Sequence, residues 1–440
     1  MIENYENYRD PKIDFLQTIP NHWAVKPFRR VFSESAEING HEPIGQMLSV
    51  SGYRGVEPKV YDSENKRRTA EETENYRVVR PGQLAVNTMW MNYAGLGVSS
   101  HLGHVSPAYR VYDISSEIVP RYAHHLLRSY VWVQGYTAFL TGIRPNSLQL
   151  SREDLMSFPV LVPPKEEQQL IADYLDHETT EIDAFIADQT LFRELVTESF
   201  HSFLTEIFES RMLSTCRLKD FGVTKVSGVS VNGSSEPARD SELGVLKTGS
   251  VSKGYFDASE NKAVLDPAEI ERLKTPVRAG HLIVNRANTP ELVGSLAPVV
   301  HDCPHLFLSD LLWQLKFEKI DPNYIYWYSK TRKFRDQISL IKVGASQTMQ
   351  KIRFEDFARL EIPFMSLEEQ RSVLTKASEE GARVQQVVRL VGHVIDLARE
   401  RRAALITAAV TGQIDVTARN KPAAEQLEDD IAQGLHREYA

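Results

Sequence analysis

The stretch Arg80-Pro-Gly-Gln-Leu-Ala-Val-Asn87 returns later in the chain as Arg278-Ala-Gly-His-Leu-Ile-Val-Asn285, 198 residues further on. Each copy combines a glycine-containing turn with a short apolar run, which is the pattern of a turn that leads into a buried strand. Self-similarity over such a distance indicates an internal duplication of a whole structural unit.

Further matches extend the duplication toward the C-terminus at a slightly larger offset. Gly142 matches Gly344, Glu153-Asp-Leu155 matches Glu355-Asp-Phe357, and Glu166-Glu-Gln168 matches Glu368-Glu-Gln370, all 202 residues apart. The four extra residues are explained by one loop insertion. The chain is therefore predicted to consist of two similar halves.

Both halves present their parts in the same order: a β-rich stretch, a short aromatic helix, a polar glycine-containing loop, proline and a long helix. We predict an α+β fold, in which two similar globular domains, β-rich with short helices, are joined by two long antiparallel coiled helices. The expected bounds are 1–165 and 214–365 for the globular domains, 166–213 and 366–416 for the long helices, and 417–440 for a polar tail.

Apolar residues recur at spacings of three, four or seven in both long helices, which favours a paired-helix seam. The small residues of the second helix would accommodate the bulky ones of the first. The predicted seam residues are Ile182, Phe185, Phe192, Val196, Phe203, Val384, Val387, Val391 and Leu405.

The negative charge of the chain is concentrated in one segment. The net charge is −8, yet residues 166–213 alone carry −10, and the two globular parts together carry about +4. Local charge decides binding to phosphate, so a nucleic-acid partner remains compatible with this composition. The acidic face of the first helix would repel DNA and is expected to face protein or water.

The composition also indicates the cellular compartment of the protein. Cys216 and Cys303 are the two cysteines, which excludes a disulfide framework and fits a reducing cytoplasm. Apolar runs long enough for a membrane span are missing, and the acidic N-terminal stretch does not resemble a secretory signal. We expect a cytoplasmic protein with no membrane contact.

Sequence motifs for catalysis are missing as well. There is no phosphate-binding loop, no His-Glu-x-x-His motif and no methyltransferase tetrapeptide. The His101/His104 and His124/His125 pairs lack a third ligand at metal spacing. Two clusters that begin at Asp62 and Asp257 faintly resemble nuclease sites, although a solvated turn explains them better. We expect no catalytic residues and no metal site, and we retain a self-contained methyltransferase or nuclease as the alternative.

The duplicated pattern resembles the specificity subunits of type I restriction–modification systems across nearly the whole chain. The motifs that carry this resemblance are Ile19-Pro-Asn-His-Trp23, Gly142-Ile-Arg-Pro-Asn-Ser-Leu148, Val162-Pro-Pro-Lys-Glu-Glu-Gln168, Ala172-Asp-Tyr-Leu-Asp176 and the segment Arg402–Ile414. The second half departs from the pattern, because Ile362-Pro-Phe lacks the double proline and Gly344-Ala-Ser-Gln lacks Pro-Asn.

The resemblance implies that each globular domain is a target-recognition domain that reads one half of a bipartite double-stranded DNA site. It implies that the helix pair fixes the spacing between the half-sites and docks two modification (methyltransferase) subunits, which restriction/translocase subunits would join. S-adenosylmethionine, ATP and Mg²⁺ would then belong to those partners, and this chain would hold no cofactor.

Arginine, lysine, asparagine and glutamine are the side chains best suited to bases and phosphates. Such residues gather in the polar loops and beside the duplicated strand, and Trp90 follows a polar turn at a strand end. The predicted DNA-contacting residues are Lys66, Arg67, Arg68, Trp90, Arg144, Asn146 and Gln149 in the first half, and Arg286, Asn288, Lys342, Gln347, Gln350, Lys351 and Arg353 in the second. A scaffold that does not read DNA is a third hypothesis.

Overall fold

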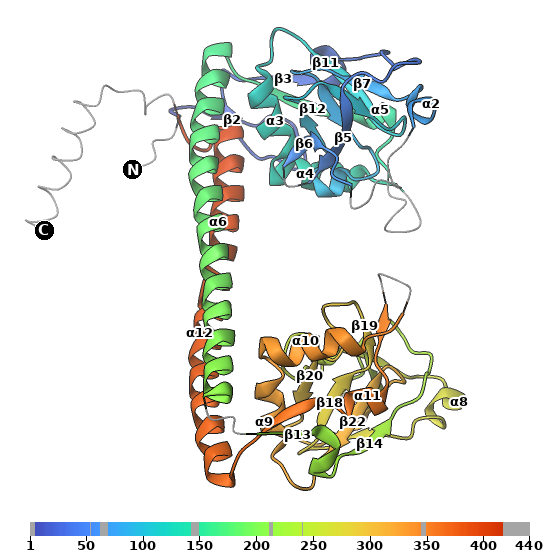
Figure 1. The fold of residues 1–440 in the computed structure, drawn as a ribbon. Helices are drawn as coiled ribbons and strands as arrows, with labels where there is room; N and C mark the ends of the chain where they lie inside the picture. Colours follow the sequence, from blue (N-terminus) through green and yellow to red (C-terminus); the bar gives the residue numbers. More distant parts are fainter. Residues whose placement is uncertain are drawn as a thin grey trace, which may run out of the picture. The chain divides into compact units, whose positions relative to one another are not determined.

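The computed structural model describes residues 5–52, 54–61, 69–141, 149–210, 214–239, 241–344 and 349–416. By its contacts the chain divides into two compact units. The first unit holds residues up to 189 together with residues from 393 onward, and the second holds 190–392. The long helices α6 (Lys165–Glu209) and α12 (Leu367–Val410) therefore contribute one segment each to both units (Figure 1).

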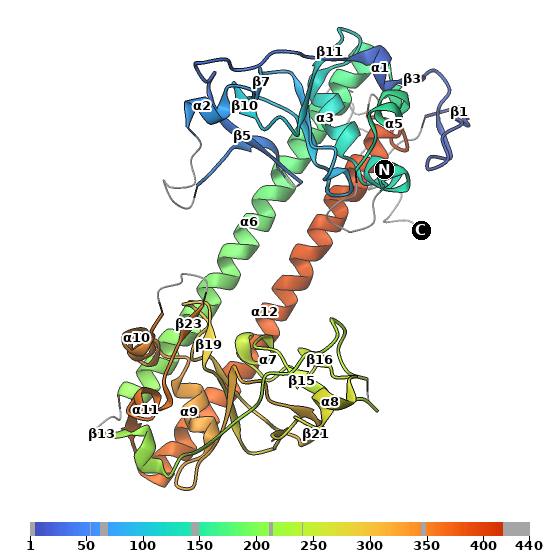
Figure 2. The same cartoon turned by 90° about the vertical axis from the view of Figure 1, so that its right-hand side faces the viewer.

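The first unit is built on two four-stranded sheets. One has the order β4-β11-β8-β9 and is antiparallel throughout, while the other has the order β6-β5-β10-β7 with a parallel β5–β10 pair (Figure 2). The strands of these sheets are β4 (Phe32–Glu34), β5 (Gln46–Ser51), β6 (Gly55–Pro58), β7 (Arg77–Val79), β8 (Leu84–Val86), β9 (Leu96–Val98), β10 (Gly103–Val105) and β11 (Arg110–Ile114).

Smaller elements complete the first unit. Two ribbons, β1 (Tyr8–Arg9) with β2 (Ile19–Pro20) and β3 (Ala24–Pro27) with β12 (Pro159–Val162), are antiparallel. The short helices are α1 (Phe28–Val31), α2 (Ala70–Thr73), the 3₁₀ turn η2 (Met91–Tyr93), α3 (Pro120–Arg128), α4 (Tyr130–Phe139) and α5 (Arg152–Ser157).

The second unit repeats the two four-stranded sheets of this plan. Its sheets have the orders β14-β22-β18-β20 and β16-β15-β21-β17, again with one parallel pair, β15–β21, and the ribbon β13–β24 corresponds to β3–β12. The strands are β13 (Ser214–Arg217), β14 (Thr224–Ser227), β15 (Gly244–Leu246), β16 (Asn261–Ala263), β17 (Pro276–Val277), β18 (Leu282–Asn285), β19 (Ala287–Asn288), β20 (Leu296–Pro298), β21 (Cys303–Phe307), β22 (Leu312–Lys316), β23 (Gln350–Lys351) and β24 (Glu361–Phe364).

The short helices of the second unit match those of the first only in part. After the 3₁₀ turn η4 (Leu218–Phe221) come α7 (Gly249–Ser252), α8 (Pro267–Ile270), α9 (Pro322–Tyr328), α10 (Arg332–Ile341) and α11 (Phe354–Phe357). The predicted duplication and the α+β fold class are thus confirmed. None of the described helices carries an apolar stretch that could cross a bilayer.

The duplicated motif is the central strand of each unit, and it is buried on both faces. Leu84 and Val86 face the core beneath α3 and α6, whereas Ala85, between them, faces the core between the two sheets. Alternate residues of a strand point to opposite faces, so burial of both faces requires an uninterrupted apolar run. In the second unit Ile283 occupies the inter-sheet position of Ala85.

The turn before each central strand requires glycine. Gly82 has φ +88° and Gly280 has φ +73°, a region that side chains with a Cβ rarely adopt. Each glycine N–H donates to the neighbouring strand, to the carbonyl oxygens of Ser99 and Val299 respectively, at 2.8 and 2.9 Å. The Arg-x-Gly pattern therefore sets the register at which the strand enters its sheet.

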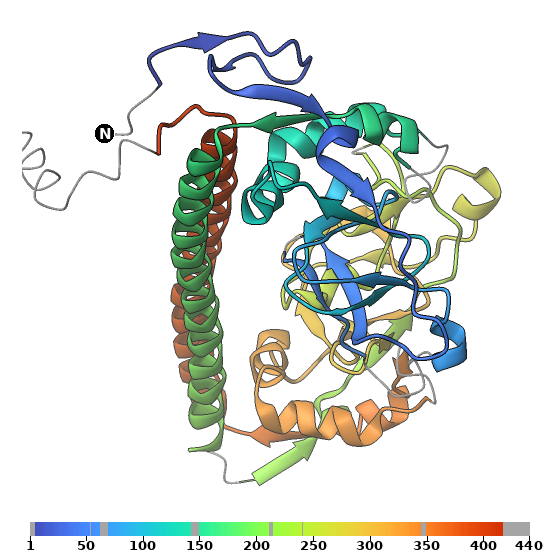
Figure 3. The ribbon, with the colours of Figure 1, turned by 90° about the horizontal axis from the view of Figure 1, so that it is seen from above.

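Each unit contains the start of one long helix and the end of the other. In the first unit Leu175 of α6 shares a core with Ile406 and Val410 of α12. In the second unit Phe208 of α6 shares a core with Val373 of α12. Figures 1 and 3 show the two helices side by side, and in each unit the contacts pair them antiparallel.

Polar contacts fasten the helices to the first unit. The Arg402 Nε–Asp183 Oδ1 ion pair, 2.9 Å long, joins α12 to α6. The buried Glu167 carboxylate accepts hydrogen bonds from Trp23 Nε1 at 2.9 Å and from the hydroxyl of Tyr5. Tyr8 in turn donates to the carbonyl oxygen of Gly412, at 2.9 Å, just beyond α12. The N-terminal segment thus ties the beginning of α6 to the end of α12.

The predicted seam is only partly buried. Ile182 and Val391 are buried, and Val196, Phe203, Val384, Val387 and Leu405 are half-buried. Phe185 and Phe192, however, are 43% and 48% exposed, so for these two residues the prediction differs from the structure. Ile186, one turn after Ile182, is buried instead. Spacings of three and four both satisfy a heptad pattern, and the sequence alone did not distinguish Phe185 from Ile186.

This difference generates the first prediction. Phe208→Ala removes a fully buried ring from the core of the second unit and is expected to lower the free energy of unfolding by about 3–5 kcal/mol. Phe192→Ala, on the same helix, removes a half-exposed ring and should cost less than about 1 kcal/mol. Calorimetric unfolding of the two variants checks this, and equal losses would contradict the assigned burial.

Candidate nucleic-acid interface

The second unit brings several predicted DNA-contacting residues together on one ribbon. Strand β19 pairs antiparallel with β23, so that Asn288 lies opposite Gln350 and Ala287 lies opposite Lys351. Lys351 also bridges to Val343 through two backbone hydrogen bonds of 2.8 and 2.9 Å. Residues that are 62 and 64 positions apart in the sequence therefore form one surface.

Side chains on this ribbon differ in how they are held. Asn288 Nδ2 donates to Ser252 Oγ at 3.3 Å, and Gln350 Nε2 donates to the carbonyl oxygen of Gly344 at 3.0 Å. Lys351 and Arg353 are exposed, whereas Lys342 is half-buried where α10 ends. The two amides are oriented by the scaffold and the cations project into solvent, which suits readout by the amides and phosphate contact by the cations.

Arg286 has a different environment. Its backbone pairs with Leu311 and Ile352, and its Nε is buried with no hydrogen-bond partner among the described residues. A buried donor without a partner is costly. Arg286 therefore stands at the base of the ribbon rather than on its exposed edge.

The first unit has the equivalent arrangement around Gln149. Thr141 and Gln149 exchange backbone hydrogen bonds of 3.2 and 3.0 Å, as Val343 and Lys351 do in the second unit. Leu150 N donates to the carbonyl oxygen of Thr88, and the Gln149 side chain donates to Thr88 Oγ1 at 3.3 Å. The same structural position in both units thus bears predicted DNA-contacting residues.

Trp90 lies on the turn that follows β8, close to this position. Its side chain is 57% exposed, and its ring centroid is 5.5 Å from that of Tyr93, which is 60% exposed. The sequence points to Trp90 but not to Tyr93, because only the η2 turn brings the two rings onto one face. Six predicted residues, Lys66, Arg67, Arg68, Arg144, Asn146 and Gln347, lie outside the described residues.

The Asp257 cluster, weighed above as a faint nuclease pattern, is a charged turn. Asp257 accepts from Lys253 Nζ at 2.9 Å and from Ser259 Oγ at 2.6 Å, and these hydrogen bonds lower the pKa of its carboxyl. Glu260 pairs with the same lysine at 3.3 Å. Among the residues that the structure describes, no group of His, Cys, Asp and Glu is placed to hold a metal ion.

A half-buried cation occupies the same position in both units but makes different contacts in each. In the first unit the Arg128 guanidinium donates to the carbonyl oxygens of Ser51, Gly52, Ala94 and Leu96, at 2.5–3.2 Å. Burial lowers the pKa of Arg128 to about 10. These four hydrogen bonds fix the β5 end to the turn that carries Trp90.

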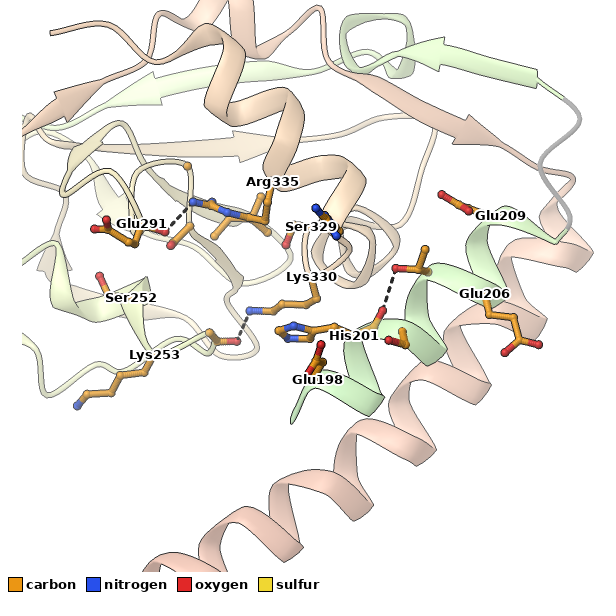
Figure 4. Close-up of a pocket in the computed structure, with 17 residues that line it drawn as sticks. Glu198, His201, Glu206, Glu209, Ser252, Lys253, Glu291, Ser329, Lys330 and Arg335 are labelled. Carbon is orange, nitrogen blue, oxygen red and sulfur yellow. Dashed lines mark hydrogen bonds between the residues drawn. The ribbon is translucent and has the colours of Figure 1, made fainter. Parts of the chain in front are cut away.

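Lys330 replaces this arginine in the second unit, 202 residues on. Its Nζ donates to the carbonyl oxygen of Gly254 at 3.2 Å and lies 4.8 Å from the centroid of the Tyr326 ring. A lysine lacks the planar fork of arginine and reaches fewer carbonyl groups. Beside it lies an open cavity of about 890 Å³, lined by α6 residues such as His201 and by the α9–α10 junction (Figure 4).

Burial lowers the pKa of Lys330 to about 8, below its ordinary value of 10.5. Lys330 in turn contributes, after burial, to lowering the pKa of His201. None of the predicted DNA-contacting residues that the structure describes lines this cavity. Its chemistry is therefore separate from that of the ribbon.

The lowered pKa of Lys330 predicts a pH dependence of stability. Between about pH 8 and pH 10.5 the unfolded chain keeps this proton while the folded chain has lost it, so the unfolded state binds more protons and stability rises with pH. Relative to Lys330→Met, which lacks the group, the wild-type chain should gain a few kcal/mol over this range.

Calorimetric unfolding at a series of pH values measures this difference. Lys319→Met, which removes an exposed lysine of the same unit, is the control and should follow the wild-type profile. Parallel pH profiles for the wild type and Lys330→Met would contradict the assignment.

Comparisons with known proteins bear on this architecture. No family model matches the chain. Over 185 residues it is 24% identical to the type I restriction enzyme StySPI specificity subunit of Salmonella potsdam, a match that covers 41% of this chain and 39% of that protein. The resemblance to type I specificity subunits is confirmed. The match spans about two fifths of the relative's length.

One solved structure shares the fold. A chain from a structure concerned with assembly and conformational transition of the type I restriction–modification system is 14% identical, with a TM-score of 0.63, and the match covers 90% of this chain and 99% of that one. The HsdS subunit of Thermoanaerobacter tengcongensis is also 14% identical, with 90% and 98% covered and a TM-score of 0.41. The first likeness supports the two-domain, two-helix architecture.

Proposed function

We propose that this chain is the DNA-recognition subunit of a type I restriction–modification complex and has no catalytic site of its own. The observation that carries the proposal is the duplicated unit, in which the same bridge at the end of the central strand presents candidate DNA-contacting residues twice. The similarity to the StySPI specificity subunit supports it. Each unit would read one half-site of a bipartite duplex, so the complete site would be asymmetric.

The paired helices would set the gap between the half-sites. A stiff helix pair holds two readers at a defined separation far better than a flexible linker does. This is supported by the packing of both helices in the core of each unit. Each unit therefore depends on α6 and α12 for its core. The proposed gap therefore depends on helix length.

The helices would also dock modification subunits. In the first unit Phe185, Val394 and Leu397 are exposed beside Glu178 and Glu181, around a shallow groove of about 410 Å³. In the second unit the exposed apolar residues of α6 and α12 include Leu191, Phe192, Leu195, Leu367 and Leu390. Apolar side chains among carboxylates fit a partner surface that is apolar with a basic rim.

S-adenosylmethionine, ATP and Mg²⁺ would be bound by the modification and restriction subunits. This chain would supply the choice of sequence alone. Methyl transfer by the purified chain without partners would overturn the proposal in favour of a self-contained enzyme.

The proposal is tested by methylome sequencing of a host that expresses the chain with its modification subunits. We expect a bipartite motif that disappears when the chain is omitted. Removing one heptad from each helix, residues 187–193 and 391–397, should shorten the gap by about three base pairs, because seven helical residues rise about 10 Å. Both half-site sequences should stay the same.

Asp188→Ala alters the same turn of α6 without shortening it and should leave the motif unchanged. An unchanged gap in a folded double-deletion variant would refute the spacing role of the helices. A scaffold that assembles partners without reading DNA predicts that replacing Gln347 and Lys351 together by alanine leaves the DNA binding and methylation of the complex unchanged.

Lys351 generates a separate prediction about affinity. Lys351→Ala is expected to weaken DNA binding about equally for all sequences and to reduce the slope of log affinity against log salt by about 1, because one phosphate contact is lost. Lys376→Ala, an exposed lysine of α12, is the matched control and should leave the slope unchanged. Titrations of the assembled complex at several salt concentrations measure both slopes.

A further inference from the structure

The turn after β8 displays large apolar side chains that the fold itself does not use. Trp90 and Tyr93 are 57% and 60% exposed, and Met89, next to them, is 40% exposed. Their neighbour Met91 is fully buried and anchors the turn in the core of the first unit. Exposed apolar groups that gather on one turn of a folded surface indicate a contact with another molecule.

Hydrogen bonds and close packing hold the backbone of this turn in place. Trp90 O accepts hydrogen bonds from Tyr93 N at 3.0 Å and from Gly95 N at 2.8 Å, and Trp90 N donates to Asn87 O at 3.0 Å. Close packing adds to this, since a Cβ on Gly52 would lie 2.3 Å from Tyr93 O. Together with the Arg128 hydrogen bonds to Ala94 and Leu96, these contacts hold the backbone that carries the two rings in place.

The residues around the two rings favour a nucleic acid as the molecule that the rings contact. Residues 81–109 include no Asp, Glu, Lys or Arg, so no carboxylate of this stretch would repel an approaching phosphate. Thr88, two residues before Trp90, bonds to Gln149 and Leu150, and thus joins the turn to the bridge that bears the candidate DNA-contacting residues.

The two units differ at this turn. The second unit has two more residues between Asn285 and Leu296 than the first has between Asn87 and Leu96, and its turn forms β19, which carries Asn288. At the third position after the duplicated motif, the first unit thus has the indole of Trp90 and the second has the amide of Asn288. This difference points to a different mode of DNA contact in the first unit.

We infer that Trp90 and Tyr93, flanked by Met89, form an apolar wedge that inserts between two base pairs of the half-site read by the first unit. The inference rests on the proposed function and names a contact for it. Apolar wedges that separate a base step cost a few kcal/mol of stacking, which the burial of the inserted side chains offsets. Specificity then arises from how easily a given base step opens.

The distribution of tryptophan allows a direct test. The chain has five tryptophans, and the other four, Trp23, Trp132, Trp313 and Trp327, are at most 9% exposed. The full chain labelled with 5-fluorotryptophan is assembled with unlabelled modification subunits and with a duplex that carries the motif found by methylome sequencing. We expect the Trp90 fluorine resonance, assigned with Trp90→Phe, to shift on DNA binding while the four others stay in place.

A second measurement reports on the DNA. With 2-aminopurine placed at successive positions of the half-site, fluorescence should rise at a single base step in the wild-type complex and not in Trp90→Ala. Since stacking of a base on an aromatic ring contributes about 1–3 kcal/mol, Trp90→Ala should weaken target binding roughly 5-fold to 150-fold. Tyr130→Ala, which removes a 62% exposed ring on α4, is the control and should bind normally.

The outcomes separate the wedge from the proposed function. A Trp90 resonance that stays in place while the target is bound tightly would overturn the wedge alone. A shift caused by the modification subunits without DNA would also overturn it and would assign the rings to a protein contact. If the wild-type complex does not bind the duplex, the proposed function fails and the wedge fails with it.

Discussion

Completion of each core by segments of both long helices is the constraint on which the rest of the structure depends. The core of the first unit contains Ile406, Ala409 and Val410, which are contributed by the end of α12. The core of the second unit contains Leu204 and Phe208, contributed by the end of α6. Both helices are therefore anchored at their two ends by burial of apolar side chains.

The duplicated strand explains why so much of the fold could be predicted from the sequence. A strand buried on both faces tolerates only apolar residues, and its preceding turn requires glycine, so Leu84–Val86 and Leu282–Val284 keep the same pattern in both copies. The sequence also shows the Glu-Glu-Gln repeat, but it does not show what these side chains bind. Gln168 caps backbone groups of Glu117, Val119 and Pro163, and Glu167 binds Trp23.

Other features could not be predicted from the sequence, because they depend on which way a side chain faces and on which strands pair, rather than on residue type. A heptad pattern does not determine whether Phe185 or Ile186 faces the partner helix. Pairing of β19 with β23, which places Asn288 opposite Gln350, arises from two segments that are far apart in the chain. Arg128 and Lys330 share the offset of 202 with the duplicated motifs, so the sequence does contain a signal for this pair of cations, although not for their partners.

The shared cores also bear on the order in which the nascent chain folds. Residues 190–392 contain everything that the second unit requires, whereas the first unit needs Ile406 to Val416, which leave the ribosome after nearly all the rest. The half that is synthesised first is consequently finished last. Until then Leu175 and its neighbours lack their α12 partners, and apolar surface left uncovered during synthesis is the kind that molecular chaperones protect.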